Sequence, residues 1–143
     1  MKSYELAYVA GIVDGEGSIG LHKSNRTGSI SMQVRVSMTS VGLIYWLGET
    51  FGGSVCRKKV EETRKPIYCW TLGGKGGSKF LKRMLRYLKV KKPQAELALK
   101  FLARRHHIRA KMHKEGRAKM SLEERQTLNM FRDVMLKLNK RGI

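Results

Sequence analysis

The strictest pattern in the chain is the alternation of apolar and polar side chains over residues 29–38, SISMQVRVSM. Apolar residues occupy every second position from Ile30 to Met38, and Ser, Gln or Arg stands between them. Successive side chains of a β-strand point to opposite faces of its sheet, so a period of two predicts a strand with one buried and one solvated face. We therefore expect a sheet that is covered on one side only.

The segment before this strand has the same period. Ile19 and Leu21 stand in the buried phase of residues 18–24, and the turn-like residues 25–28 lead into residue 29. Two such strands joined by a short polar turn predict an antiparallel hairpin.

A second hairpin is predicted from strands at residues 54–60 and 67–72, which a polar segment connects. The phase of its first strand stays open between two sets of outward residues. These are Cys56, Lys58 and Val60, or Arg57 and Lys59. We favour the first set, because it leaves Tyr68, Trp70 and Leu72 inward and places Cys69 on the outward face.

Helices are predicted before and after each hairpin. Residues 4–14 are rich in apolar side chains, with Ser3 as N-cap and Gly15 as terminator. Residues 41–51 follow Ser40 and end at a Gly-Gly pair, which is typical of a helix with both ends marked.

Three more helices are predicted in the second half of the chain. Residues 80–88 repeat apolar side chains at helical spacing, with Ser78 near the start. Pro93 suits the first turn of the next helix, and Ser121 with Glu124 three residues on forms a capping box for the last one.

The predicted order is therefore α-β-β-α-β-β-α followed by two helices. We expect one α+β domain over residues 1–143, with a core at about residues 4–88 and a C-terminal helical extension at about 93–140. Its four-stranded antiparallel sheet would have helices on one face and leave the other face open.

The composition favours a polyanionic partner. The chain of 143 residues holds 30 Lys or Arg and 11 Asp or Glu, a formal net charge of +19. Nucleic acid would offset the resulting self-repulsion, because each neutralised phosphate releases counterions. A purely charge-driven RNA binder, of the ribosomal kind, has the same composition. A membrane-surface role is disfavoured, because the charges are spread over the whole chain.

Other classes are excluded by composition and pattern. With 41% hydrophobic residues the chain is not a disordered basic tail. No apolar run approaches the roughly 18 residues of a membrane helix, and the N-terminus lacks the pattern of a signal peptide. Two cysteines are too few for a disulfide scaffold. We expect an intracellular protein that does not enter a membrane.

The open sheet face has the side chains of a DNA reader. Arg and Gln pair bidentately with guanine and adenine edges, and a two-stranded ribbon fits the major groove. The alternative is a plain solvated face. The predicted base-contacting residues are His22, Ser24, Arg26, Ser29, Ser31, Gln33, Arg35, Lys58 and Cys69.

The chemistry is concentrated where the first helix ends. Residues 15–20 formally match the dinucleotide fingerprint G-x-G-x-x-G, but here a helix precedes and a strand follows, so we reject that site. Asp14 and Glu16 stand at the negative end of the helix dipole, an unfavourable place that a divalent cation would offset. The Glu16 carboxylate and the Gly15 carbonyl are hard oxygen ligands suited to Mg²⁺. The alternative is that both acids bond locally.

Residues 9–17, VAGIVDGEG, resemble the LAGLIDADG motif of the homing endonucleases. The match includes the Ala-Gly pair, both acids and the closing Gly, and the predicted order of elements is that of the family's core. Residues 88–96, LKVKKPQAE, are similar to the family's stretch after the third core helix.

The resemblance implies a homodimeric, site-specific, double-strand DNA endonuclease that acts on a long pseudo-palindromic site. The motif occurs once, so the first helix would pack against its copy through Ala7, Ala10, Gly11 and Asp14. The second acid maps onto Glu16 as the ligand of Mg²⁺, with the Gly15 carbonyl beside it; other divalent cations such as Mn²⁺ or Ca²⁺ can bind. Asp14 maps onto the first acid, with a structural role, and Lys91 onto a catalytic lysine near the scissile phosphate.

Phosphate contacts are expected from the basic residues around and beyond this segment. They are Lys89, Lys92, Arg104, Arg105 and Arg109. One departure is residues 37–42, SMTSVG, which lack the Gln and Arg that some relatives place after the second strand. Two alternatives share the fold: an intron RNA maturase, for which RNA is a partner, and a DNA-binding protein that has lost cleavage.

The remaining histidines and cysteines have plainer interpretations. His106 and His107 are adjacent and cannot share a helix face, so surface roles are favoured for them and for His113 over a zinc site. Cys56 and Cys69 could stand opposite each other across the second hairpin, with free thiols as the default.

Overall fold

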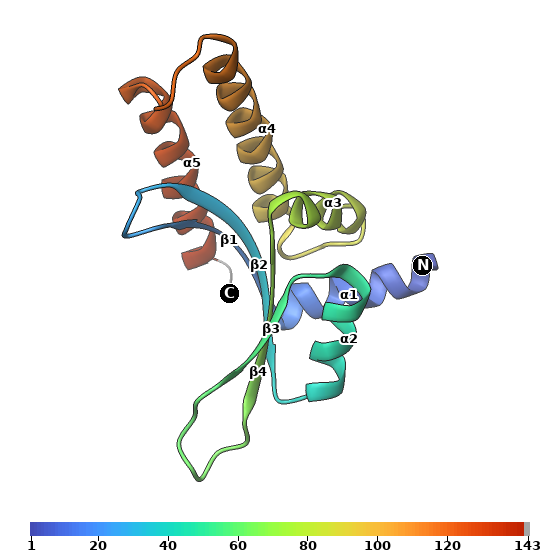
Figure 1. Ribbon diagram of the computed structural model, residues 1–143. Coiled ribbons are helices and arrows are strands. Elements are labelled where there is room, and N and C mark those ends of the chain that lie inside the picture. The colour runs from blue at the N-terminus through green and yellow to red at the C-terminus, as the bar shows by residue number, and fades with distance from the viewer. Residues whose placement is uncertain (142–143) are drawn as a thin grey trace.

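The computed structural model describes residues 1–141 and confirms the α+β class (Figure 1). The elements are α1 (Ser3–Glu16), β1 (Gly17–Lys23), β2 (Ile30–Met38), α2 (Val41–Phe51), β3 (Ser54–Lys58), β4 (Ile67–Gly73), α3 (Gly74–Met84), α4 (Lys92–Lys114) and α5 (Leu122–Arg141). Among the described residues, no helix is both long and apolar enough to cross a membrane.

The four strands form one antiparallel sheet in the order β1-β2-β4-β3. The register aligns the buried phases of neighbouring strands, with Val34 opposite both Ile19 and Leu72. Helices α1, α2 and α3 lie on one side of the sheet, and the opposite face of the two hairpins is open (Figure 1). The one-sided sheet expected from the period of β2 is therefore what the chain builds.

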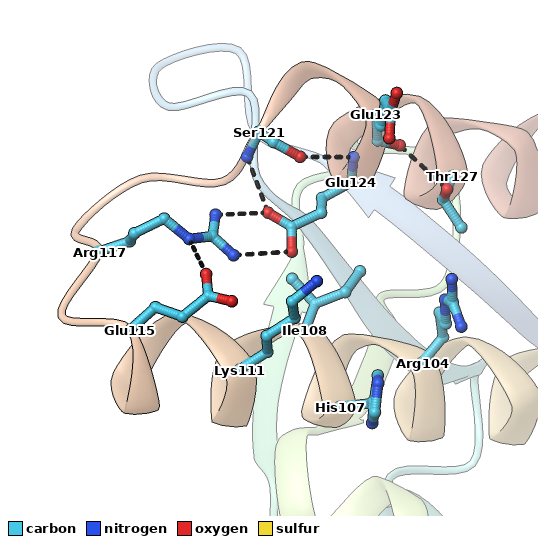
Figure 2. A pocket seen from close by; sticks show the side chains of 10 residues that line it. All are labelled: Arg104, His107, Ile108, Lys111, Glu115, Arg117, Ser121, Glu123, Glu124 and Thr127. Carbon is cyan, nitrogen blue, oxygen red and sulfur yellow. Dashed lines mark hydrogen bonds and ion pairs between the residues drawn. The ribbon is translucent and has the colours of Figure 1, made fainter.

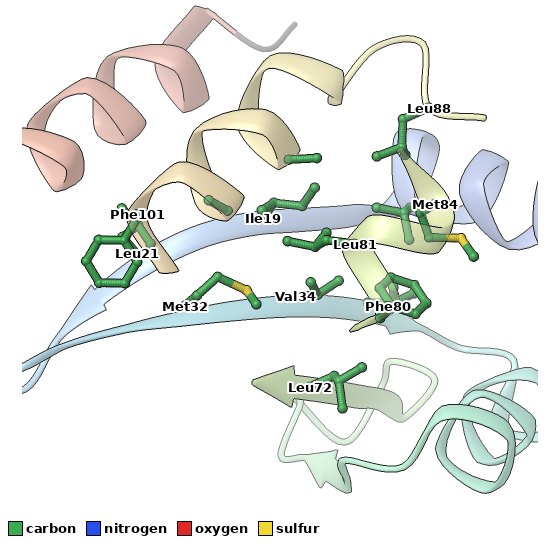
Figure 3. Close-up of a cluster of buried hydrophobic side chains, with 14 of the residues drawn as sticks. Ile19, Leu21, Met32, Val34, Leu72, Phe80, Leu81, Met84, Leu88 and Phe101 are labelled. Atoms are coloured by element: carbon green, nitrogen blue, oxygen red, sulfur yellow. The ribbon is translucent and has the colours of Figure 1, made fainter. Parts of the chain in front are cut away.

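The core fills the covered side. Figure 3 shows Met32 and Val34 of β2 on the same side as Phe80 of α3 and Phe101 of α4. Trp70 of β4 is fully buried, packs edge-on against Phe80 at 5.4 Å between ring centroids, and donates from Nε1 to the Gly52 carbonyl at 2.7 Å. The indole therefore ties the end of α2 to the sheet.

The favoured phase of the second hairpin is confirmed. Val55 pairs with the buried Trp70, so Cys56 stands on the open face directly opposite Cys69. Both thiols are free, in agreement with the default interpretation. β3 ends at Lys58 and not at residue 60, because Pro66 has no N–H to extend the ladder beyond the first residue of β4.

Both ends of α1 differ from the prediction. α1 continues through Gly15 to Glu16, and Gly17 is its C-cap. At its other end Lys2, and not Ser3, is the N-cap, with its amide N–H donating to Glu5 Oε2 at 2.9 Å. The propensity of glycine predicts a stop at Gly15, but an exposed glycine in a helix is only disfavoured and not forbidden.

α3 begins at Gly74, directly after β4, and so starts earlier than the predicted position near Ser78. The reason is tertiary packing, which overrides the poor helix propensity of glycine. A Cβ at Gly77 would lie 2.6 Å from the Met32 Cε, so the missing side chain lets the first turn of α3 approach β2.

The capping box predicted at the start of α5 is confirmed. The Glu124 amide donates to Ser121 Oγ at 3.1 Å, and the Ser121 amide donates to Glu124 Oε1 at 2.8 Å. Arg117, in the connection after α4, donates to Glu124 at 2.7 Å and to Glu115 at 2.7 Å (Figure 2). These contacts join the α4 end to the α5 start, and the hydrogen bonds from Arg117 and then Ser121 lower the pKa of Glu124 to about 2.

The replacement Glu124→Gln is expected to lower stability at neutral pH and to matter less in acid. The folded-state pKa lies below the ordinary value of 4.5, so the stabilisation is present above pH 4.5 and is lost as pH falls toward about 2. Urea unfolding of both proteins at a series of pH values measures the difference. Glu123→Gln is the control, because it removes an adjacent charge that does not contact Arg117; an equal pH dependence in both variants would contradict the assignment.

Candidate nucleic-acid interface and metal site

The end of α1 is held tightly against the first strand. Gly17 follows Glu16 directly, and a Cβ at this position would lie 2.8 Å from both the Cα and the carbonyl oxygen of Val13. Only glycine fits such an approach without a shift of the backbone. The helix therefore passes into β1 with no linker, and the exposed side chain of Glu16 stands at the junction of helix and sheet.

Asp14 fastens a distant segment to this junction. Its Oδ2 accepts the amide N–H of Lys89 at 2.8 Å, and its Oδ1 accepts those of Val90 at 3.2 Å and Lys91 at 2.9 Å. In return the Lys91 Nζ donates to the Asp14 carbonyl at 2.6 Å. The alternative of local bonding is thus wrong for Asp14, whose partners are distant in sequence, and the Lys91 ammonium contacts a carbonyl only two residues before Glu16.

The open face of the first hairpin presents the residues predicted from the alternation of β2. His22 pairs with Ser31 and Arg35 pairs with Ser18 across the two strands, while Gln33 faces Gly20. His22 and Arg35 are exposed, and Ser31 and Gln33 are half-buried.

The other predicted contact residues of this face lie at its two ends. Ser24, Arg26 and Ser29 are in the connection between β1 and β2, where Ser29 Oγ is 2.9 Å from Thr27 Oγ1. Lys58 is exposed at the end of β3. The open side of the two hairpins is thus polar and positively charged. We call this surface the reading face; it comprises His22, Ser24, Arg26, Ser29, Ser31, Gln33, Arg35 and Lys58.

Cys69 requires a correction. It is in the outward phase, as predicted, but only 2% of the residue is exposed, so it is not accessible for a base contact. Burial raises the pKa of its thiol, but hydrogen bonds with Ser37 and Thr71 and the charges of Arg35 and Lys58 together lower it below its ordinary value. The neighbours on the open face cover this small side chain, which the period of the strand could not indicate.

No protein-family model matches the chain, and no curated protein does. Solved structures do match. The homing endonuclease I-CvuI in complex with DNA aligns with a TM-score of 0.73 at 17% identity, over 94% of this chain and 82% of that chain. I-TnaI, another homing endonuclease, aligns at 0.63 and 18% identity over 96% and 97%. The archaeal intron-encoded I-Vdi141I, complexed with DNA, aligns at 0.60 and 16% identity over 97% and 99%.

The chain has the LAGLIDADG homing-endonuclease fold. At these identities the likeness is one of architecture, and it agrees with the resemblance carried by residues 9–17. The fold reaches beyond the seven-element core, because the alignments cover 94–97% of the chain and therefore include α4 and α5.

The homing-endonuclease fold implies a divalent cation, and the residues at the end of α1 have the chemistry to hold one. Glu16 offers an exposed carboxylate, and the Gly15 carbonyl lies in the last helical turn, where carbonyls lack intrahelical partners. Mg²⁺ typically takes one or two carboxylates and fills its other positions with waters and substrate phosphates. Within residues 1–141 no three His, Cys, Asp or Glu side chains gather as a ready-made cage.

The exposed face of α1 differs from the predicted one. Ala10 is fully buried in the core of its own chain, and Asp14 is occupied by the Lys89–Lys91 amides. Ala7 and Gly11 are exposed, as an interface with a second copy requires. Tyr4 and Tyr8, which are 65% and 57% exposed, extend this face and were missed. Their spacing of four residues from each other was the available signal.

The predicted phosphate contacts lie in three places. Lys89 and Lys92 are exposed beside the Asp14 contacts. Arg104 lines the pocket of about 460 Å³ between α4 and α5 that Figure 2 shows, together with the exposed His107. Arg105 is half-buried and donates from Nη1 to the Ile30 carbonyl at 2.9 Å. Of the other histidines, His106 and His113 are exposed.

Replacement of Asp14 by Ala is expected to release the Lys89–Lys91 segment. Three backbone donors would be deprived of a charged acceptor, and hydrogen bonds to charged groups contribute about 1.5–3 kcal/mol each in mutational series. Amide hydrogen exchange should accelerate at Lys89 and Lys91, while the amides of β2 keep their protection. Glu5→Ala, which removes the acid at the other end of α1, is the control; unchanged exchange at Lys89 and Lys91 in Asp14→Ala would contradict the role assigned to Asp14.

Proposed function

We propose that the chain is a homodimeric, site-specific DNA endonuclease that hydrolyses both strands with a divalent cation. The observation that carries the proposal is that the Lys91 ammonium binds the Asp14 carbonyl at the same end of α1 that carries the exposed Glu16, next to β1 of the reading face. The Glu16 carboxylate, the Lys91 ammonium and a surface for contacts with bases are then close together. Metal-assisted cleavage of a phosphodiester requires a metal ligand and a positive charge beside the bound DNA.

Recognition of DNA is supported by the reading face and by charge. The reading face combines Arg, Gln, Ser and His side chains on two twisted antiparallel ribbons, the shape that enters a major groove. The net charge of +19 favours binding of any nucleic acid and steers its approach. I-CvuI and I-Vdi141I, which share the fold, are described in complex with DNA.

The cation is assigned to Glu16 and the Gly15 carbonyl. When bound, it would activate a water and stabilise the leaving oxygen, as divalent cations do in phosphodiester cleavage. Lys91 lies beside this position and would stabilise charge on the scissile phosphate. I-CvuI is described with Mg and with Ca in complex with DNA, which supports a divalent cation at this fold.

The homodimer is supported by the exposed face of α1. Ala7 and Gly11 leave the helix backbone accessible, and no atom lies within 4 Å of a Cβ placed on Gly11, so a second helix can approach closely there. The length of I-GzeII is consistent with two copies, since 93% of this chain aligns with only 44% of that endonuclease. Two copies of this chain would supply about the same length, and their symmetry would favour a pseudo-palindromic site.

Replacement of Glu16 by Gln is expected to abolish cleavage and to leave DNA binding nearly unchanged. Loss of a metal ligand removes several kcal/mol of transition-state stabilisation, which is at least about a 100-fold loss in rate. The probe is the duplex that the wild-type chain selects from a randomised pool, incubated with MgCl₂ and resolved by gel electrophoresis.

Glu49→Gln on α2 is the matched control, because it removes an exposed acid from a different helix. Full cleavage by Glu16→Gln would refute the ligand assignment. Binding without cleavage by the wild-type chain would favour the cleavage-inactive protein, and selective binding of intron RNA would favour the maturase.

Replacement of Gly11 by Arg is expected to prevent self-association and to leave the monomer folded. The new side chain projects into open space in the single chain but would clash with, and repel, a second α1. Sedimentation velocity gives the mass of both proteins. Ala110→Arg adds the same charge at an exposed position of α4 and should behave as wild type; a dimer in Gly11→Arg would exclude this face as the interface.

A further inference from the structure

A second basic site lies away from the end of α1 and includes two of the predicted phosphate contacts, Arg105 and Arg109. A pocket of about 530 Å³ opens between the β1–β2 connection and the pair of helices α4 and α5. Five of the residues that line it are cationic, and none is Asp or Glu. These cations are Lys23, Arg105, Arg109, Lys119 and Arg125.

Neutral hydrogen-bonding groups complete the lining. Thr27 and Ser29 bring hydroxyls from the β1–β2 connection, and Asn129 brings an amide from α5. Lys23 Nζ is 3.4 Å from Asn129 Oδ1, so the strand end and the helix are already linked at the rim of the pocket. Hydroxyls, amides and guanidinium groups together are the donors that proteins direct at phosphate oxygens.

The charges in this pocket are not balanced by the chain. Arg105 is half-buried, and burial and the nearby Arg109 both lower the pKa of its guanidinium. Within residues 1–141, the ion pairs of the chain involve Arg64 and Arg117 and none of the five cations of the pocket. Arg117 in the neighbouring pocket differs from these five cations, because the carboxylates of Glu115 and Glu124 form ion pairs with it (Figure 2).

The pocket adjoins the outer end of the reading face. The connection that supplies Thr27 and Ser29 also carries Ser24 and Arg26, which are predicted to contact bases. In Figure 1 this connection and the turn between α4 and α5 lie at the same end of the molecule. A duplex that follows the reading face would therefore bring its backbone past the pocket.

We propose that this pocket binds one backbone phosphate of the DNA at the outer end of each half-site. The inference rests on the proposed function, and it assigns to α4 and α5 a role in fixing the register of the duplex. A contact of this kind positions the DNA and adds affinity without reading sequence. Helices α4 and α5 would then bind DNA in addition to packing against the hydrophobic core.

The test is the double replacement Lys119→Gln and Arg125→Gln. Both residues are exposed and line only this pocket among those described, whereas Arg105 and Arg109 also line a notch between α3 and α4. Binding of the selected duplex is measured over a series of salt concentrations. The slope of log Kobs against log salt should fall in magnitude by about 0.9 for each phosphate that the variant no longer neutralises. Lys111→Gln, which removes a charge from the pocket of Figure 2, should leave the slope unchanged.

The position of the phosphate is tested with duplexes shortened one base pair at a time from both ends. Wild-type affinity should drop in one step, at the length where the phosphate is removed, and the double variant should show a smaller step there. Equal slopes, or the same step in both proteins, would overturn the proposal. The proposal would also be overturned if the double variant bound a structured RNA more weakly than the wild type but bound the duplex equally well. Failure of the proposed function is distinct, because the wild-type chain would then select no sequence from the pool, or would bind the selected duplex without cutting it.

Discussion

The carboxylate of Asp14 is the interaction on which the arrangement of the candidate site depends. Three consecutive amides of the segment before α4 converge on it, and the Lys91 ammonium returns to the carbonyl of the same residue. Without these bonds nothing polar among the described contacts would hold residues 89–91 to the end of α1. The site is therefore assembled from two parts of the chain that are 75 or more residues apart.

The acidic residues are confined to a few parts of the sequence. No acid occurs in residues 17–48, 63–95 or 97–114, which include most of the reading face, α3 and α4. Several of the acids that do occur are held in hydrogen bonds within the chain, as at Asp14, Glu115 and Glu124. Glu16 differs from these three, since its exposed carboxylate makes no ion pair among the described residues. A cation between this carboxylate and a phosphate would offset the repulsion between the two anions.

Most of the fold could be predicted from the sequence because its strands and helices are amphipathic. The period of β2 defined both faces of the sheet, and the side-chain volumes of Tyr68, Trp70 and Leu72 decided the phase of β4. The errors arose where packing outweighs local preference. Gly15 is helical although glycine commonly ends a helix, and Gly77 is helical although glycine disfavours helices, since its missing Cβ leaves room for Met32. Ala10 is buried in the core, and Cys69 is covered by its neighbours on the open face. Both outcomes depend on other elements of the fold, so the spacing of residues along the sequence could not predict them.

The separation of the two phases of β2 has an evolutionary consequence. Val34 and Val36 are fully buried and Met32 is nearly so, whereas Ser31, Gln33 and Arg35 make no contribution to that packed layer. Changes among the second set alter the chemistry presented to a ligand and leave the folded state almost untouched. A chain with this architecture can therefore exchange the polar residues of β2 through intermediates that all fold, while the apolar residues of the same strand maintain the core.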